Sequence, residues 1–268
     1  MGKTLAIILN HNLPEFTDPL FEELNRYRSD DYDLEVIDNG SQEAYVSKYT
    51  TIRYDQNFFW GGALNKAFEM VHQNSKYDSL LFLNNDLEVN GKIFVKSLRH
   101  ELFRKNFAIV SPCIAGKAAP WPQMQNWGGK GTRVVKWIDN QAPLFHRKLI
   151  EAVGQFDEAL NFGWGQELIC HDVCRAHKWK IGVCDHISII HFKKQTFKKG
   201  RLFSLDNQIS DPEHEFVSHE DYQTSFRSSW LDYFRRNPLR YESFQHLVDY
   251  GRFYTFNPLE TGKRTFFK

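Results

Sequence analysis

The sequence lacks several features that mark particular classes of protein. It has no apolar run near the roughly 18–20 residues that span a bilayer, and the apolar run at residues 5–9 is too short for a signal peptide. Basic and acidic residues nearly balance, with 34 Lys and Arg against 33 Asp and Glu, so no global field attracts nucleic acid. These absences favour a globular chain with no transmembrane segment and no nucleic-acid partner.

Cysteine is scarce, with four residues and no Cys-x-x-Cys pair. Cys170 and Cys174 lie at helical spacing with His171 between them, which could suggest zinc, but no second ligand pair follows at a usual distance. A chain of 268 residues has enough core to fold without disulfides. We therefore expect buried, reduced thiols and a cytoplasmic protein.

Apolar, strand-like runs alternate with amphipathic or polar segments in the first ninety residues. Strands are expected at residues 4–9, 34–37 and 79–83, and helices at residues 19–28 and 61–73. This alternation predicts an α/β fold of Rossmann-like type, with a mainly parallel sheet flanked by helices. Ligands of such sheets bind beyond the carboxyl ends of the strands.

The remaining elements are less regular. Strand character is seen at residues 108–112, 134–145, 181–184 and 187–190, and helical character at 148–153 and 167–177. After His191 the composition changes to a basic loop that contains Lys194, Lys198 and Lys199. Residues 215–268 are rich in aromatic and charged side chains, and we expect helices there.

Polar side chains follow two of the expected strands. Asn84, Asn85 and Asp86 end the run at 79–83 and supply the amide and carboxylate oxygens that Mg²⁺ and Mn²⁺ prefer. Asp38 ends the run at 34–37, where a carboxylate could accept hydrogen bonds from a base or ribose. On the residues alone, an ordinary Asn/Asp turn is the more common explanation of each motif.

Three further groups could carry chemistry. Asn57, Gly61 and Asn65 surround a helix start whose backbone N–H groups could approach a ligand, with helix packing as the alternative. Glu167 begins a helix and is placed to act as a general base, although a carboxylate there also favours the helix dipole. His191 could bind a metal or phosphate, or be structural.

Taken together and in this order, these motifs resemble the family 2 glycosyltransferases, nucleotide-sugar-dependent enzymes of the GT-A fold. The resemblance covers roughly residues 4 to 192, through segments 6–12, 36–41, 57–67, 83–86, 137–147, 154–158 and 163–175 and through His191. It implies a catalytic domain at 1–195, with a nucleotide-sugar half at about 1–110 and an acceptor half at about 111–195. Residues 196–268 would form a basic loop and a helical C-terminal appendage.

The resemblance also implies roles for individual residues. The donor site would contain Asn10, Asn12, Asp38, Asn57, Gly61, Asn65, Asn84 and Asn85. Asp86 and His191 would bind the divalent cofactor, Mn²⁺ or Mg²⁺. Glu167 would be the catalytic base, with Asp172 as the alternative because Leu168 stands where the family commonly has Asp. The first Asp of the family's Asp-x-Asp motif is Asn84 here, which weakens the expectation of a metal.

The implied activity is inverting transfer of a sugar from a nucleotide diphosphate sugar, UDP-linked, to a hydroxyl of a glycan or glycolipid. One carboxylate base opposite the leaving group predicts inversion at the anomeric carbon. Trp137, Asp139 and Trp164 are the candidate acceptor-binding residues.

Two alternatives stay open. A sugar-phosphate nucleotidyltransferase would need a Gly-rich phosphate loop after the first strand, which residues 10–14 do not supply. A non-catalytic glycan- or nucleotide-binding relative is compatible with Asn84 and Leu168. The aromatic and basic residues after position 230 could contact a membrane surface peripherally, pack on the catalytic domain or form a homo-oligomer contact.

Overall fold

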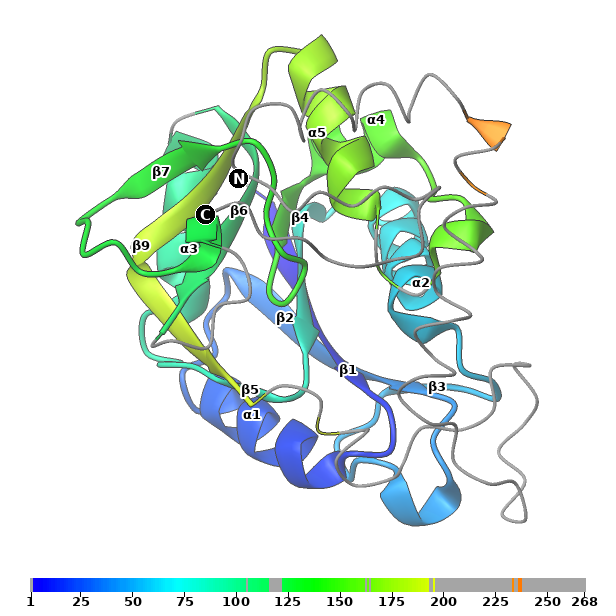
Figure 1. The fold of residues 1–268 in the computed structure, drawn as a ribbon. Coiled ribbons are helices and arrows are strands. Elements are labelled where there is room, and N and C mark those ends of the chain that lie inside the picture. Colours follow the sequence, from blue (N-terminus) through cyan, green and yellow to red (C-terminus); the bar gives the residue numbers. More distant parts are fainter. Residues whose placement is uncertain are drawn as a thin grey trace.

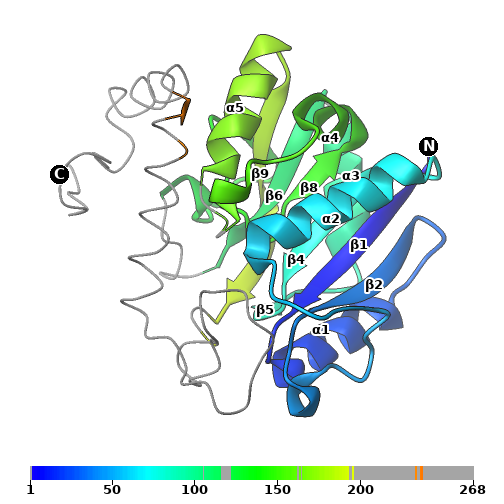
Figure 2. The same ribbon diagram turned by 90° about the vertical axis from the view of Figure 1, so that its right-hand side faces the viewer.

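The structure is a computed structural model and describes residues 2–104, 106–115, 122–161, 163, 165–192, 195, 233, 236 and 237. These residues form one mixed nine-stranded sheet with helices on both faces (Figure 1). The strand order is β3-β2-β1-β4-β8-β6-β9-β5, with β7 paired to β9. Helices α1 and α3 cover one face of the sheet, and α2, α4 and α5 cover the other (Figure 2). The predicted α/β class is confirmed.

The first half of the sheet is parallel and brings three strand ends to one edge. In the register of the sheet, Asn10 pairs with Asp38 and Leu9 pairs with Asn84. The polar residues that follow these strands therefore lie side by side. The elements are β1 (Lys3–Asn10), α1 (Pro14–Arg26), β2 (Tyr32–Asn39), η1 (Glu43–Tyr45), β3 (Ile52–Tyr54), α2 (Phe59–Gln73) and β4 (Tyr77–Asn84).

The second half of the sheet is mixed. Strand β8 runs antiparallel between β4 and β6, and β9 pairs with β5, β6 and β7. The pairing of β5 with β9 sets His191 opposite Leu87, next to Asp86. The elements are β5 (Leu87–Glu88), α3 (Phe94–Arg104), β6 (Phe107–Ile114), η3 (Pro122–Met124), β7 (Thr132–Val135), β8 (Leu144–His146), α4 (Arg147–Val153), η4 (Glu158–Leu160), α5 (Gln166–Ala176) and β9 (Lys180–His191).

Three local expectations were wrong. The first helix begins at Pro14, not at Pro19, because proline is tolerated in the first turn, where no intrahelical N–H bond is needed. Residues 134–145 form two strands separated by a polar loop, because Asp139, Asn140 and Gln141 interrupt the apolar pattern. The runs at 181–184 and 187–190 are one strand with a register shift against β6.

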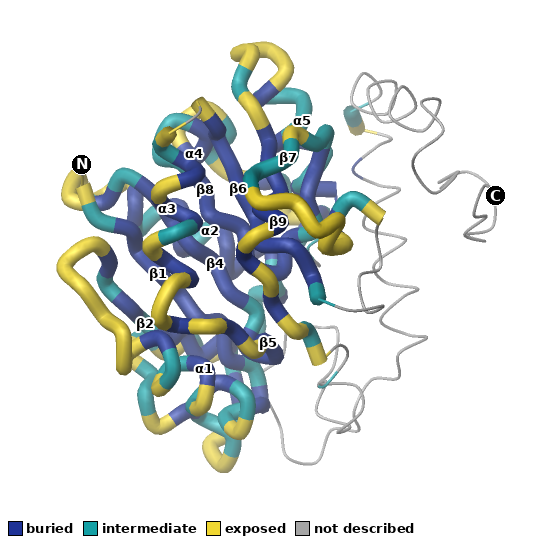
Figure 3. Tube along the Cα trace, turned by 90° about the vertical axis from the view of Figure 1, so that its left-hand side faces the viewer, coloured by how far each residue is buried: buried dark blue, intermediate teal, exposed yellow. Residues whose placement is uncertain are grey.

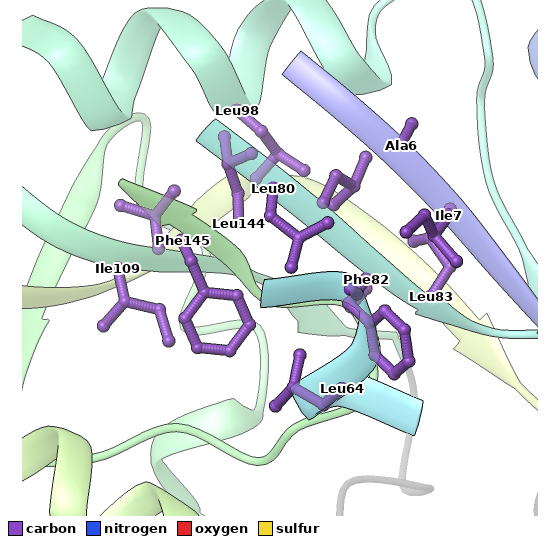
Figure 4. Packing of buried hydrophobic residues seen from close by; sticks show 14 of the residues in the cluster. Ala6, Ile7, Leu64, Leu80, Phe82, Leu83, Leu98, Ile109, Leu144 and Phe145 are labelled. Carbon is purple, nitrogen blue, oxygen red and sulfur yellow. The ribbon is translucent and has the colours of Figure 1, made fainter. Parts of the chain in front are cut away.

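The core lies on both faces of the sheet, as expected for strands with continuous apolar runs. On β4, Leu80, Phe82 and Leu83 are fully buried, and Leu64 of α2 and Leu98 of α3 pack on opposite faces (Figure 4). The central strands are buried along their length, whereas the loops at the sheet edges are exposed (Figure 3). This packing fixes the strand ends that carry the candidate site.

All four cysteines are buried free thiols. Among the described residues, no helix is long and apolar enough to cross a membrane. Two described residues from the C-terminal region contact the α/β domain: Tyr233 is buried in its core, and Arg236 lies 3.0 Å from Asp157 in an ion pair. The predicted domain boundaries stay predictions, and Lys194, Lys198 and Lys199 lie outside the described residues.

Candidate active site

A buried polar network lies at the carboxyl ends of β1 and β2. Asn10 is fully buried, and its Nδ2 donates to Asp38 Oδ2 at 2.8 Å and to Ser41 Oγ at 3.2 Å. Thr17 donates its hydroxyl to Asn10 Oδ1 at 2.7 Å, and Ser41 N donates to Asp38 Oδ1 at 3.0 Å. Arg53 Nε lies 3.9 Å from Asp38 Oδ1. The Asp38 carboxylate is therefore held in one orientation by Asn10, Ser41 and Arg53, which come from three segments of the chain.

Asn12, Asn57 and His11 continue this network. Asn12 accepts from Gln42 N at 2.9 Å, and Asn57 Oδ1 accepts from Asn39 Nδ2 at 2.9 Å. The His11 ring lies 2.9 Å from Asn39 O and 3.3 Å from Asn57 Nδ2. Burial lowers the pKa of His11, so the neutral imidazole is favoured at pH 7. No sequence pattern marks His11, because a histidine in a turn has no characteristic pattern.

Asp86 and His191 form a carboxylate–imidazole pair. His191 Nε2 lies 3.1 Å from Asp86 Oδ1, and Phe192 N donates to Asp86 O at 3.0 Å. The other ring nitrogen of His191 is buried and has no hydrogen-bond partner among the described residues. The hydrogen bonds of β5 with β9 thus bring together two residues that are 105 positions apart in the chain.

This pair fits a divalent cation only in part. Carboxylate and imidazole are both metal-binding groups, but Mg²⁺ and Mn²⁺ need several oxygen ligands. Within the described residues, no group of three or more His, Cys, Asp and Glu side chains is arranged to hold a metal ion. Asp86 and His191 can therefore supply two ligands, and a diphosphate or water would have to supply the others.

Asn84 and Asn85 point to different neighbours. Trp60 Nε1 of α2 donates to Asn84 Oδ1 at 2.7 Å, so one lone pair of that oxygen is already used. Asn85 Nδ2 donates to Thr17 Oγ1 at 3.1 Å and joins the network around Asn10. Hydrogen bonds thus connect Asp38 through Asn10 and Thr17 to Asn85, which follows β4, and form a continuous polar edge of the sheet.

Gly61 and Asn65 lie at a packing contact. Gly61 N donates to Asn161 O at 2.6 Å, and a Cβ on Gly61 would lie 2.6 Å from Leu160 O, closer than real contacts allow. Asn65 makes two hydrogen bonds of 2.9 Å with the main chain of Phe156. Their described contacts hold α2 against the segment that leads into α5.

Glu167 is the second residue of α5, and the residue before the helix, Gly165, has a positive φ of 89°. The surrounding protein desolvates the Glu167 carboxyl and raises its pKa to about 8, and the negative charge of Asp139 adds to this rise. Asp139 Oδ2 accepts from Gln141 Nε2 at 2.7 Å. The loop between β7 and β8 and the start of α5 therefore place two acidic residues close enough to interact electrostatically.

The other candidates are less clearly grouped. Asp172 lies further along α5, 3.8 Å from Arg175. Trp137 is buried, so it does not present an open aromatic face. Trp164 lies outside the described residues. Trp60, Asn140 and Gln141 were missed by the sequence analysis, and only the position of Trp60 within the motif at 57–67 could have singled it out.

Comparisons with known proteins match the fold but no sequence family. No family model matches the chain, and no curated protein matches its sequence. Solved structures do match, among them GalNAc-T7 with UDP, GalNAc and Mn²⁺, with a TM-score of 0.55 and 12% identity over 71% of this chain and 44% of that one.

Two further glycosyltransferase structures match at the same level. The mannosyltransferase PcManGT from Pyrobaculum calidifontis, in complex with GDP-Man and Mn²⁺, has a TM-score of 0.54 and 12% identity over 74% of this chain and 59% of that one. TarS of S. aureus in complex with UDP-GlcNAc has a TM-score of 0.54 and 14% identity, with 87% and 66% covered. The chain thus spans 44% to 66% of the lengths of these proteins, and it has a GT-A-like glycosyltransferase fold.

Proposed function

We propose that this protein is an inverting glycosyltransferase of the family 2 type, which moves a sugar from a UDP-linked donor to a hydroxyl of a glycan. The observation that supports the proposal is the hydrogen-bonded polar edge of a GT-A-like sheet, which runs from Asp38 to the end of β4 next to the Asp86–His191 pair. The Trp60–Asn84 bond links β4 to α2 and so to the start of α5.

The network around Asp38 suits the nucleoside. Its carboxylate would accept hydrogen bonds from the base or ribose, and Asn12 and Asn57 offer further amide groups beside it. Asp86 and His191 would hold Mn²⁺ or Mg²⁺ together with the diphosphate. When bound, such a cation offsets the negative charge that develops on the departing diphosphate.

Glu167 would act as the general base. The bond between the anomeric carbon and the diphosphate oxygen breaks, the acceptor oxygen bonds to that carbon, and the acceptor proton passes to the Glu167 carboxylate. A pKa near 8 makes this carboxylate a stronger base than an ordinary glutamate. Attack from the face opposite the leaving group gives inversion.

A non-catalytic nucleotide- or glycan-binding protein is the second candidate. It is favoured by Asn84, whose oxygen accepts from Trp60 and whose side chain carries no charge for a metal. Such a protein would keep nucleotide binding through Asp38 but would not turn over a donor.

Donor turnover separates the two candidates. Release of nucleoside diphosphate is measured from UDP-glucose, UDP-galactose, UDP-N-acetylglucosamine and GDP-mannose, with MnCl₂ or with EDTA. The proposal expects release that Mn²⁺ stimulates and that Glu167→Gln abolishes, while the exposed control Glu158→Gln keeps it. Nucleotide binding without release from any donor would support the non-catalytic candidate.

A further inference from the structure

The polar loop between β7 and β8 borders the proposed donor site. Gln141 O accepts from Asn84 N at 2.9 Å, and Pro143 O accepts from Phe82 N at 3.1 Å. These backbone bonds fix the loop beside the end of β4, two residues before Asp86. The position is next to where the proposed function sets the diphosphate.

Asn140 and Gln141 are buried amides with unused acceptors. Only 8% of Asn140 and 6% of Gln141 is exposed, yet Asn140 Oδ1 and Gln141 Oε1 have no hydrogen-bond partner among the described residues. Gln166 Oε1, at the start of α5, is a third such oxygen. Buried polar groups are normally paired, so three unpaired acceptors on two adjoining segments need an explanation.

The direction of two of these amides is fixed by chemistry. Gln141 Nε2 donates to the Asp139 carboxylate, which can only accept when it is ionised, so a flipped amide would set two acceptors against each other. Gln166 Nε2 donates to Leu160 O at 3.1 Å, which fixes that amide in the same way. The acceptor oxygens of Gln141 and Gln166 therefore cannot be satisfied by exchanging the two ends of the amide.

The missing partner of Gln141 and of Gln166 must be a hydrogen-bond donor, and Asn140 Oδ1 lacks the same kind of partner. Phosphate oxygens accept hydrogen bonds, so a diphosphate does not satisfy these amides, whereas each sugar hydroxyl carries one O–H and an N-acetyl group carries one N–H. On the basis of the proposed function, we propose that Asn140 and Gln141 bind O–H or N–H groups of the transferred sugar and so determine which donor sugar is accepted.

Binding of a sugar nucleotide and of its nucleoside diphosphate separates this role from the nucleotide site. Both dissociation constants are measured by calorimetry with Mn²⁺, using whichever of UDP-glucose, UDP-galactose, UDP-N-acetylglucosamine and GDP-mannose binds wild type most tightly. The variants are Asn140→Leu and Gln141→Met, which remove the acceptor, and Asn140→Asp, which keeps one. Gln73→Met, on the exposed end of α2, is the matched control.

We expect Asn140→Leu and Gln141→Met each to raise the dissociation constant of the sugar nucleotide about tenfold, which corresponds to about 1.4 kcal/mol of binding free energy. The nucleoside diphosphate should bind as in wild type, which also shows that the variants fold. Asn140→Asp and Gln73→Met should bind the sugar nucleotide nearly as wild type does.

Three results would overturn the inference. In the first, the variants bind the sugar nucleotide and the nucleoside diphosphate more weakly by the same factor. In the second, the variants bind the sugar nucleotide as tightly as wild type does. In the third, wild type binds nucleoside diphosphates but none of the four sugar nucleotides. If wild type bound no nucleoside diphosphate either, the proposed function would fail as well, which is a distinguishable result.

Discussion

The raised pKa of Glu167 predicts how the rate of sugar transfer depends on pH. Desolvation and the Asp139 charge raise this pKa from 4.5 to about 8. A base must be ionised to act, and at pH 7 roughly one-tenth of the protein would have Glu167 ionised. We therefore expect kcat/KM to fall about tenfold for each pH unit below this pKa.

The assay is nucleoside diphosphate release between pH 5.5 and 9 at constant Mn²⁺. Asp139→Asn removes the neighbouring charge, so it should lower the pKa of Glu167. The acidic limb of the pH profile, where kcat/KM falls with falling pH, should then move to lower pH. Glu167→Gln should abolish transfer across the range. Asp172→Asn tests the alternative base and should leave the limb in place.

Thermal stability gives an independent check of the same pKa. Because folding raises the pKa of Glu167, the folded state favours the protonated carboxyl, and the stabilising contribution is lost as pH rises through about 8. The Tm of wild type should thus fall relative to that of Glu167→Gln between pH 4.5 and 8. If the rate fell only below about pH 4.5, or if Glu167→Gln kept full activity, Glu167 would not be the base with a raised pKa.

Three further predictions concern the metal pair and the stability of the fold. Asn84→Asp adds a carboxylate next to Asp86 and can still accept from Trp60, so Mn²⁺ should bind about tenfold more tightly, measured by calorimetry with UDP present. Asp86→Asn removes the carboxylate of the pair and should abolish the effect of Mn²⁺ on the dissociation constant of UDP. Arg133→Met leaves Asp185, which is buried and lies 2.6 Å from Arg133 Nε, without its ion-pair partner. We expect a loss of about 3 kcal/mol in urea unfolding, and an unchanged unfolding midpoint would contradict it.

The parallel half of the fold could be predicted from the sequence, because each strand there is one apolar run that ends in polar residues. The expected runs at 4–9, 34–37 and 79–83 lie within β1, β2 and β4. Parallel pairing then sets Asn10 beside Asp38, which needs no information beyond the strand ends. The helix expected at 61–73 is α2, whose apolar positions at spacings of three and four are buried.

The second half could not be predicted in the same way, because its contacts join residues far apart in the chain. Asn65 bonds to the main chain of Phe156, 91 positions away, and nothing near Asn65 indicates that partner. The insertion of β8 between β4 and β6 likewise decides that Gln141 lies beside Asn84. Buried acceptors without partners are visible only once the neighbours of each amide are known.

Proton NMR of the donor's anomeric signal tests most directly whether the protein transfers sugar with inversion. Wild-type protein is incubated with Mn²⁺ and each of UDP-glucose, UDP-galactose, UDP-N-acetylglucosamine and GDP-mannose. We expect that, for at least one donor, the α-anomeric signal is replaced first by that of the β-anomer, and that Glu167→Gln prevents this change. Stable signals from all four donors, or a first product with the α configuration, would contradict this expectation.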